Sequence, residues 1–457
     1  GVVESGVSPC DCPGRRPRYH RIALTHSEAS VVADLERHLG PRPVVTDRDV
    51  VHGYAIDWSN RFHGSPACVV RVRSRDEVVT VLERSAALGF PVVAQGGNTG
   101  LVGATMAPQG SVILNLSGLT GIVADGDTSL VAEAGSTIAS VQEAASRLGL
   151  VFGLDLASRD SATVGGAFNT NAGGIYASYW GRMRDQVIGV EAVMADGTVV
   201  STIEGNAEAG WGADPVDVLA GSEGTLAVVT ALRLRLRTPV ADTTVVMAGF
   251  DSVEAAAQLT AGVPGVMAGE LLGETEMATV VERGGLARPM APHPWYLLIE
   301  VESGSVDLLE FDDDAVVGSS LWSYRQGIGE SIDGLGIPHK FDVVVPPERL
   351  EDLHADLARR LAPNRVFMFG HLLRSNAHFN VVPPHLEATV PEDVDYLVLD
   401  AVEAAGGSAV GEQGVGRAKG ERVRASLPPG RRELIDALKR ALDPDGRLNP
   451  GAGAARA

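Results

Sequence analysis

Three glycine-rich loops beside short apolar stretches are the feature that most restricts the fold of this chain. The first loop, at residues 95–100, reads Gln-Gly-Gly-Asn-Thr-Gly and directly follows the apolar residues 92–94. The second loop spans residues 163–174, and the third, at residues 221–225, precedes an apolar stretch at residues 226–236. Consecutive glycines let backbone N–H groups converge on an anion without obstruction by side chains. The three loops together therefore indicate a ligand site.

Each glycine loop taken alone is also consistent with an ordinary turn. Neither common nucleotide-binding fingerprint is present, because no GxGxxG follows the first strand and no GxxxxGK motif with Ser or Thr occurs. The loops alone do not identify the ligand.

The residues around the loops predict a mixture of helices and strands. An extended stretch is expected at residues 51–58 and a strand at residues 67–72. An amphipathic helix is expected at residues 74–88, with Ser74 as its cap. Residues 187–202 have the pattern of a β-hairpin. This mixture predicts an α+β fold.

A change of pattern at Pro239 predicts more than one domain. We expect an irregular N-terminal segment at residues 1–25 and a first domain at residues 26–239. A second α+β domain follows at residues 240–430, and a C-terminal helical segment covers residues 431–457. The chain length of 457 residues agrees with two large units or three smaller ones.

The charge balance excludes several kinds of partner. The chain has 38 Lys and Arg residues against 58 Asp and Glu residues, which gives a formal charge of −20. A surface this negative repels nucleic acid and anionic lipid, so we expect no nucleic-acid partner. No apolar stretch is long enough for a membrane span, and no signal peptide is visible. The expected location is cytoplasmic.

The three cysteines, Cys10, Cys12 and Cys68, cannot form a disulfide framework. Cys10 and Cys12 lie in the irregular N-terminal segment, where a metal-binding role for the pair stays open. Cys68 lies in the strand expected at residues 67–72.

Taken in order, the three loops resemble those of the vanillyl-alcohol oxidase / p-cresol methylhydroxylase flavoprotein superfamily. The resemblance is strongest to its FAD-linked D-2-hydroxyacid dehydrogenases, the branch of D-2-hydroxyglutarate dehydrogenase, D-lactate dehydrogenase and glycolate oxidase. It extends from about residue 57 to residue 449. It implies a two-subdomain FAD-binding domain of the p-cresol methylhydroxylase type and an α+β cap domain over the flavin. The C-terminal helical segment then returns to the FAD domain.

The resemblance also implies which residues bind FAD. The loop at residues 95–99 would hold the pyrophosphate, residues 161–174 would run beside the flavin and ribityl chain, and residues 221–225 would close the site. The implied cofactor-binding residues are Gln95, Gly96, Gly97, Asn98, Thr99, Gly100, Leu101, Thr163, Gly165, Gly166, Asn169, Asn171, Gly173, Gly174, Glu223, Gly224, Val228 and Asn449.

FAD is expected to be bound noncovalently. Many superfamily members link FAD through a His or Cys, but no His occurs between His63 and His293. Asn98 occupies the position where a histidyl linkage would often lie. Cys68 is the only thiol in the domain, and its expected place is inside a strand.

His371, His378 and Glu412 form a second group of chemistry-bearing residues. Imidazole and carboxylate are the usual ligands of a divalent metal such as zinc or manganese, although two histidines near a strand can also be ordinary polar side chains. The resemblance implies that these three residues bind such a metal. It also implies that Asn376 faces the substrate.

The same resemblance assigns two cations to the substrate. Arg325 matches the residue that clamps the substrate carboxylate, a task that suits a planar guanidinium. Without the resemblance, Arg325 would read equally well as a surface charge on a helix. Lys340 matches a second cationic contact.

Two departures from the family pattern concern the chemistry itself. The family's general base, a His after the metal-binding Glu, is Gln413 here, and an amide cannot titrate near neutral pH. Arg374 replaces an Asp between the two metal-binding histidines, which weakens the metal site or holds a further anionic group of the substrate. Three explanations remain open for the lost base: the metal lowers the hydroxyl pKa, His339 substitutes, or the substrate or reaction has changed.

The expected function is oxidation of a D-2-hydroxy acid to the 2-oxo acid, with hydride transfer from the α-carbon to flavin N5. The partners are then a small anionic hydroxy acid and an electron acceptor that the sequence does not identify. An oxidase of a different alcohol and a flavin-binding subunit without turnover are the alternatives. Related enzymes often dimerise, which leaves a homodimer open.

Overall fold

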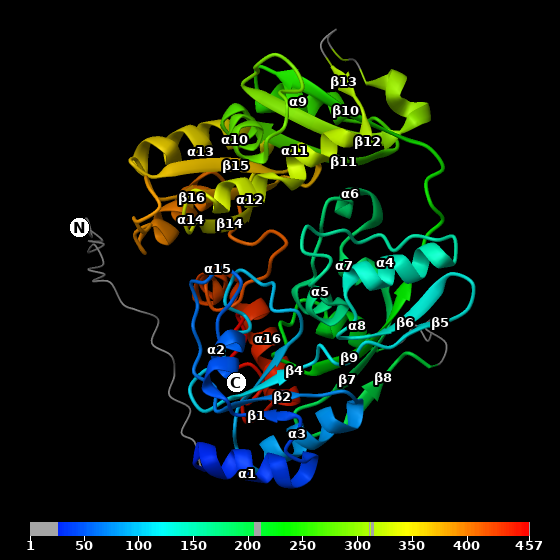
Figure 1. Cartoon of the computed structure of the whole chain (residues 1–457), viewed down its shortest axis with the longest axis vertical. Coiled ribbons are helices and arrows are strands. Elements are labelled where there is room, and N and C mark those ends of the chain that lie inside the picture. Colours follow the sequence, from blue (N-terminus) through cyan, green and yellow to red (C-terminus); the bar gives the residue numbers. More distant parts are fainter. Residues whose placement is uncertain (1–25, 205–211, 310, 312–314, 457) are drawn as a thin grey trace, which may run out of the picture.

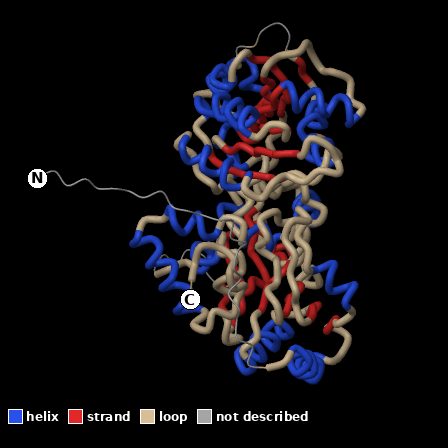
Figure 2. Tube along the Cα trace, turned by 90° about the vertical axis from the view of Figure 1, so that its left-hand side faces the viewer, coloured by secondary structure: helices blue, strands red, loops and turns tan. Residues whose placement is uncertain are grey.

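The computed structural model describes residues 26–204, 212–309, 311 and 315–456 and arranges their strands in three sheets. Two sheets and their helices form the lower part of the molecule in Figure 1, and the third sheet with its helices forms the upper part. Turned by 90°, the two parts stand one above the other, with many loop segments between them (Figure 2). The expected N-terminal segment, with Cys10 and Cys12, lies outside the described residues.

The first sheet has four strands in the order β1-β2-β4-β3. Strands β2, β4 and β3 are parallel, whereas β1 is antiparallel to β2. Helix α3 begins after Ser74, whose hydroxyl accepts a hydrogen bond from the N–H of Glu77, as the sequence predicts. The bounds of these elements are β1 Val44–Val45, β2 Cys68–Arg71, β3 Val92–Gln95, β4 Val112–Asn115, α1 Glu28–Leu39, α2 Arg48–Tyr54 and α3 Arg75–Leu88.

The second sheet is antiparallel, in the order β5-β6-β9-β7-β8, and includes the predicted hairpin as β7 and β8. Its core joins residues of β6, β7 and β9 with those of α4 and α5. The bounds are β5 Ile122–Ala124, β6 Ser129–Glu133, β7 Val187–Val193, β8 Val199–Ser201, β9 Val228–Arg235, α4 Ile138–Arg147, α5 Val164–Thr170, α6 Ala177–Trp180, α7 Met183–Gln186 and α8 Pro215–Leu219.

The third sheet has seven strands in the order β13-β10-β12-β11-β15-β16-β14, with every pairing antiparallel. One core packs α9, α13 and α14 against the sheet, and a separate core packs α10, α11 and α12. The strands are β10 Thr243–Phe250, β11 Val266–Gly273, β12 Trp295–Glu302, β13 Val316–Val317, β14 His339–Val344, β15 Arg365–His371 and β16 Asn376–Val382. The helices are α9 Val253–Thr260, α10 Glu274–Gly284, α11 Trp322–Gln326, α12 Ile328–Asp333, α13 Pro347–Arg360 and α14 Val394–Ala404, with 3₁₀ turns η1 Ser303–Leu308, η2 Ser319–Leu321 and η3 Leu372–Arg374.

The last part of the chain returns to the first sheet. Helices α15 (Gly420–Ser426) and α16 (Pro429–Leu442), orange and red in Figure 1, lie in the lower part of the molecule. Beyond α16, Leu448 pairs with Val92 of β3 in a parallel bridge. The N–H of Asn449 donates to the carbonyl of Val92 at 2.8 Å. The returning segment therefore extends the edge of the strand that leads into the first glycine loop.

Two local expectations are wrong. The glycine-rich stretch at residues 163–174 is not wholly a loop, because residues 164–170 form helix α5 under the cap of Thr163. The stretch at residues 51–58 is not extended throughout, because α2 continues to Tyr54. In both places a capping side chain, Asp47 for α2, starts a short helix in a sequence with weak helical periodicity.

The structure agrees with an α+β fold. We propose the domain division expected from the sequence, with the first domain at residues 26–239, the cap at 240–430 and the returning segment from residue 431 onward. Within the described residues, no helix is long and apolar enough to cross a membrane.

Glu276 in α10 provides a test of the packing in the upper part of the molecule. Its side chain is buried, and Oε1 accepts a hydrogen bond from the N–H of Met368, whereas Oε2 has no hydrogen-bond partner among the described residues. Burial raises the pKa of Glu276 to about 7. The ionised form is therefore disfavoured in the folded state, and its cost grows as the pH rises from about 4.5 to 7.

We predict that Glu276→Gln becomes more stable relative to the unchanged protein as the pH rises from 5 to 8. Between these pH values, the unfolding free energy of Glu276→Gln minus that of the unchanged protein should rise by on the order of 3 kcal/mol, since one pKa unit corresponds to about 1.4 kcal/mol. Urea unfolding at several pH values measures it. Glu348→Gln, at an exposed position, is the control. A difference for Glu276→Gln that does not change with pH would contradict the prediction.

Candidate active site

The three glycine-rich segments and the seven-stranded sheet line one cavity of about 540 Å³. The cavity therefore joins both parts of the molecule. The sequence-predicted residues that line it are Gln95, Gly96, Gly97, Asn98, Thr99, Gly100, Leu101, Thr163, Gly165, Gly166, Asn169, Gly173, Gly174, Glu223, Gly224, Arg325, Lys340, His371, His378, Glu412, Gln413 and Asn449.

The first glycine loop is held in a defined shape by side-chain hydrogen bonds. Asn98 has a positive φ of 52°, its amide nitrogen donates to the carbonyl of Ile56 at 2.8 Å, and its amide oxygen accepts from the hydroxyl of Thr105 at 2.7 Å. The amide of Gln95 donates to the carbonyl of Tyr54 at 2.9 Å. Backbone in this unusual region is often found at ligand sites.

Gly96 and Gly97 have no space for a side chain. A Cβ on Gly96 would lie 2.2 Å from Oγ1 of Thr163, and one on Gly97 would lie 1.8 Å from the carbonyl oxygen of Ser161. The first and second segments therefore meet in close contact beside the cavity. Such a cradle of bare backbone suits the close approach of a phosphate-bearing cofactor.

Asn169 of α5 connects the second segment to the third. Its amide oxygen accepts hydrogen bonds from the N–H of Gly224 at 3.0 Å and the hydroxyl of Ser222 at 3.3 Å. Its carbonyl accepts from the N–H of Glu223 at 2.8 Å. The third segment is therefore fixed against the second.

Glu223 connects the glycine segments to the C-terminal part of the chain. Its carboxylate is buried and accepts hydrogen bonds from the N–H groups of Val415 and Gly416 at 2.8 to 3.0 Å. Burial raises the pKa of Glu223 despite these bonds. Asn449 donates to the carbonyls of Glu223 and Ala104 at 2.7 and 2.9 Å. Residues distant in sequence thus close the site together.

On the side of the seven-stranded sheet, a buried carboxylate lies between two predicted site residues. Glu270 of β11 accepts from Nε of Arg325 and faces Nδ1 of His371, both at 2.5 Å. Burial alone would raise the pKa of Glu270, but His371 and Arg325 lower it to about 2. Burial likewise opposes a charged imidazole, but Glu270 and Glu412 raise the pKa of His371.

A second buried carboxylate, Asp342 of β14, organises the neighbouring strand and loop. It accepts hydrogen bonds from the N–H groups of Glu412 and Gln413 and from the amide of Asn376. Its Oδ1 lies 3.4 Å from Nδ1 of His378. Burial opposes ionisation of Asp342, but His378 and the buried Lys419 lower its pKa below the ordinary value.

The predicted metal ligands meet only in part. Nε2 of His371 lies 3.4 Å from Oε2 of Glu412, and the rings of His371 and His378 are 5.2 Å apart between centroids. Across the described part of the chain, no group of three or more His, Cys, Asp or Glu side chains is arranged to hold a metal ion. The donor chemistry nevertheless fits a divalent metal, because Oε1 of Glu412 is buried without a hydrogen-bond partner.

Four of the predicted site residues do not line the cavity. Val228 is buried in a hydrophobic core, and Asn171 ends α5, where its amide accepts from the N–H of Arg184. Asn376 is turned toward Asp342 and the carbonyl of Val343. The guanidinium of Arg374 donates to the carbonyl of Ala177 at 2.9 Å.

Two basic residues considered for the chemistry, Lys340 and His339, already have acidic partners. Lys340 lines the cavity and pairs with Asp333 at 2.8 Å. His339 does not line the cavity, and its Nδ1 lies 2.7 Å from Asp395, which also pairs with Arg61 of the lower part. The geometry therefore gives no support to His339 as the replacement base.

Sequence reasoning missed several residues at the site. Glu270 and Asp342 are single acidic residues in strands, and only their buried contacts reveal them. Trp322 lies three residues before Arg325 in the same helix and could have been proposed from that spacing. The cavity-lining residues that sequence reasoning did not select are Trp58, Ala94, Ala104, Thr105, Leu116, Ala134, Asp155, Leu156, Ala157, Ser158, Arg159, Ala162, Ala167, Thr170, Ala172, Ile175, Ala227, Val229, Trp322, Gln326, Gly329, Phe341, Phe369 and Asn380.

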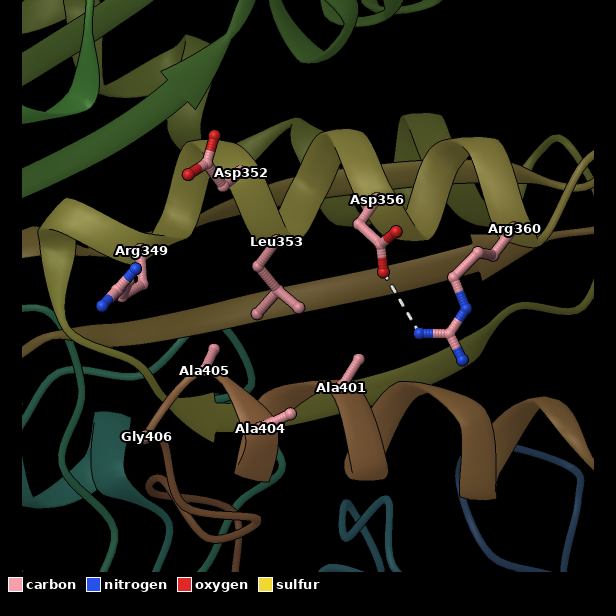
Figure 3. A pocket seen from close by; sticks show the side chains of 9 residues that line it. All are labelled: Arg349, Asp352, Leu353, Asp356, Arg360, Ala401, Ala404, Ala405 and Gly406. Atoms are coloured by element: carbon pink, nitrogen blue, oxygen red, sulfur yellow. Dashed lines mark hydrogen bonds and ion pairs between the residues drawn. The ribbon is translucent and has the colours of Figure 1, made fainter.

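A second cavity of about 460 Å³ lies between α13 and the end of α14. Figure 3 shows the charged side chains of α13, including the Asp356–Arg360 pair, above the alanines of α14. None of the predicted site residues lines this cavity.

Comparisons with known proteins give the class of protein. A family model described as "FAD binding domain" matches residues 66–203, and one described as "FAD linked oxidases, C-terminal domain" matches residues 240–452. The chain is therefore an FAD-linked oxidoreductase.

Individual relatives narrow this class. The chain is 30% identical to the mitochondrial D-2-hydroxyglutarate dehydrogenase of Bos taurus, over 96% of this chain and 86% of that protein. It is 27% identical to D-2-hydroxyglutarate dehydrogenase of Stutzerimonas stutzeri, over 93% of this chain and 99% of that protein. The chain belongs to the family of these flavoprotein dehydrogenases and acts as an oxidoreductase on CH–OH groups.

Solved structures give the same fold. Substrate-bound p-cresol methylhydroxylase superposes with a TM-score of 0.76 at 17% identity, covering 95% of this chain and 98% of the other. Alkyldihydroxyacetonephosphate synthase superposes with a TM-score of 0.72 at 14% identity, over 96% and 87% of the two chains. The expected p-cresol methylhydroxylase type of fold is confirmed.

We predict that Gly97→Ala abolishes most FAD binding, because the added Cβ would overlap the carbonyl oxygen of Ser161. The dissociation constant for FAD, measured by titrating the apoprotein, should rise at least about 10-fold, which corresponds to a loss of about 1.4 kcal/mol or more in binding. Gly53→Ala is the control, since a Cβ at Gly53 meets nothing within 4 Å. An unchanged dissociation constant in Gly97→Ala would show that the loop can move aside.

Proposed function

We propose that this protein oxidises a D-2-hydroxy acid to the corresponding 2-oxo acid, using noncovalently bound FAD. The observation that carries the proposal is the single cavity that runs from the glycine segments to Arg325, His371 and Glu412. When bound, FAD supplies flavin N5 as the acceptor for the hydride on the substrate's α-carbon. Asn98 at the position of a histidyl linkage supports noncovalent binding.

Arg325 is the residue that we assign to the substrate carboxylate. Glu270 holds its Nε, and the ring of Phe369 lies under the guanidinium at 5.0 Å. These contacts fix the plane of the guanidinium and leave its terminal nitrogens for a two-point contact with a carboxylate. Lys340 is a second cation at the cavity, although Asp333 partly neutralises it.

The hydroxyl proton lacks the acceptor that the family pattern places beside the substrate. Gln413 lines the cavity at the position of the family's base but has no group that titrates near neutral pH. We propose that a divalent metal, zinc or manganese, is held by His371, His378 and Glu412. Such a metal would lower the pKa of the substrate hydroxyl and make a dedicated base unnecessary.

An oxidase of a different alcohol, without a metal, is the second candidate. The incomplete convergence of the three donors within the described residues and the presence of Gln413 favour this reading. The electron acceptor is O₂ in that case. In the dehydrogenase reading, the acceptor is a separate partner.

The remaining properties follow from the same proposal. The substrate is a small anion that a cationic contact draws into an acidic protein. We predict a cytoplasmic location and a homodimer. Some relatives are named as mitochondrial proteins.

The test is anaerobic reduction of the bound flavin by a panel of D- and L-2-hydroxy acids, before and after chelation. Bleaching of the flavin absorbance by a D-acid, abolished by the chelator, is the expected result. Bleaching that the chelator leaves unchanged supports the metal-free oxidase. A flavin that no acid reduces excludes simple 2-hydroxy acids and contradicts the proposed dehydrogenase, which leaves the oxidase of a different alcohol and the binding subunit without turnover.

We predict that Gln413→His restores a titrating base beside the substrate. The rate of flavin reduction at pH 8 should rise at least about 10-fold, because a positioned general base contributes about 10²–10⁴-fold in enzymes. The pH–rate profile should gain a limb that ascends through about pH 6.5, the ordinary pKa of an imidazole.

Stopped-flow measurement with the best acid of the panel tests this prediction. Gln413→Asn keeps an amide at the position and should show no new limb. A Gln413→His profile that matches the unchanged protein would mean that proton removal does not limit the reaction.

A further inference from the structure

Glu270 lies at the centre of the seven-stranded sheet, where a charged side chain is least expected. Strand β11, which carries it, is flanked by β12 and β15, and the Glu270 side chain is 0% exposed. In the antiparallel register of β11 and β15, Glu270 is directly opposite His371. A buried carboxylate is costly unless charged donors satisfy it.

The two donors that satisfy Glu270 come from different elements. Oε2 accepts from Nε of Arg325 in α11, and Oε1 meets Nδ1 of His371 at the end of β15. Both distances are 2.5 Å, and a hydrogen bond to an ionised carboxylate is stronger than one between neutral groups. One carboxylate therefore fixes two side chains that line the cavity.

Each of the two side chains keeps its other face for the cavity. Contact between Glu270 and Nδ1 leaves Nε2 of His371 toward Glu412, at 3.4 Å. Within the described residues, the terminal nitrogens of Arg325 make no hydrogen bond, and Phe369 supports the guanidinium from one side. The contacts of Glu270 therefore determine which atoms of Arg325 and His371 are left toward the cavity.

We infer that Glu270 is a positioning residue that couples the guanidinium of Arg325, proposed to bind the substrate carboxylate, to the imidazole of His371, proposed to bind the metal. The inference rests on the proposed function, because it takes Arg325 as the contact of the substrate carboxylate. It adds to the site a residue that the sequence pattern does not select. The contact of Arg325 with the substrate carboxylate and the orientation of the His371 ring then depend on one shared carboxylate.

An amide cannot replace this carboxylate. Gln at position 270 has one acceptor oxygen for two donors, and its NH₂ group would face either Arg325 or Nδ1 of His371. Facing Nδ1, it would hold the opposite tautomer of the imidazole. Facing Arg325, it would push the guanidinium away from its present plane.

The test measures oxalate binding to the oxidised holoenzyme through the change in flavin absorbance. We expect Glu270→Gln and Arg325→Lys each to weaken oxalate binding at least 10-fold. The double variant should be less than about 3-fold weaker than either single variant, because both remove the same contact. Glu270→Gln should also slow flavin reduction at saturating substrate, through His371, more than Arg325→Lys does.

Glu276→Gln is the matched control. Glu276 is also a buried carboxylate, in helix α10 on the same seven-stranded sheet, but it does not line the cavity. This variant should leave oxalate affinity within 2-fold. If Glu270→Gln loses its FAD, Glu270→Asp replaces it, with an expected loss of at least 5-fold and the same lack of additivity with Arg325→Lys.

Two results would overturn the inference while leaving the proposed function intact. In both, the unchanged holoenzyme binds oxalate and is reduced by a D-2-hydroxy acid. In the first, Glu270→Gln keeps full oxalate affinity. In the second, the loss of oxalate affinity in the double variant equals the product of the two single losses, as a general structural role for Glu270 would require. An unchanged holoenzyme that neither binds oxalate nor is reduced overturns the proposed function, and this inference with it.

Discussion

The close contact of bare backbone around the cavity is the constraint on which the rest of the site depends. Gly96 and Gly97 touch the second segment, and Gly173 and Gly174 touch Glu412 and the carbonyl of Asp155, with no room for a Cβ at any of the four. This contact brings N–H groups to the cavity wall and leaves its far side to the seven-stranded sheet. The Asn169 and Glu223 hydrogen bonds then hold the segments in place. A protein built this way places its flavin by backbone shape and its substrate by side-chain charge.

Buried carboxylates orient the charged and polar side chains on the substrate side of the cavity. Glu270 and Asp342 each face an imidazole, His371 and His378 respectively. Histidines that bind metals commonly have such a carboxylate behind them, which fixes the ring and its tautomer. The arrangement therefore suits a metal even though, among the residues that the structure describes, the three donors do not converge. It suits a metal-free reaction equally well, since an oriented imidazole is also what proton transfer requires.

The sequence predicts the fold and the cofactor better than the details of the site. Ser74 with its helix and the β7–β8 hairpin depend on local spacing, and the structure bears them out. The three glycine segments line one cavity, although residues 164–170 form a helix where a loop is expected. Glu270 escapes sequence reasoning because its partner His371 lies 101 positions away, and a lone Glu in an apolar strand has no local signature. Asn376 and Arg374 follow from a motif, but their orientation depends on Asp342 and on α6, which a motif does not encode.

The return of the chain to β3 has a consequence for biosynthesis. Asn449 donates to the carbonyl of Glu223 and extends the edge of β3. This neighbour of the first glycine segment therefore comes from more than 340 residues later in the chain. Contacts of such long sequence separation carry a loop-closure cost that slows folding. A nascent chain on the ribosome can complete its sheets in turn, but it cannot enclose a flavin until residue 449 has emerged. Closure of the flavin site therefore depends on a segment that is synthesised after the rest of its lining.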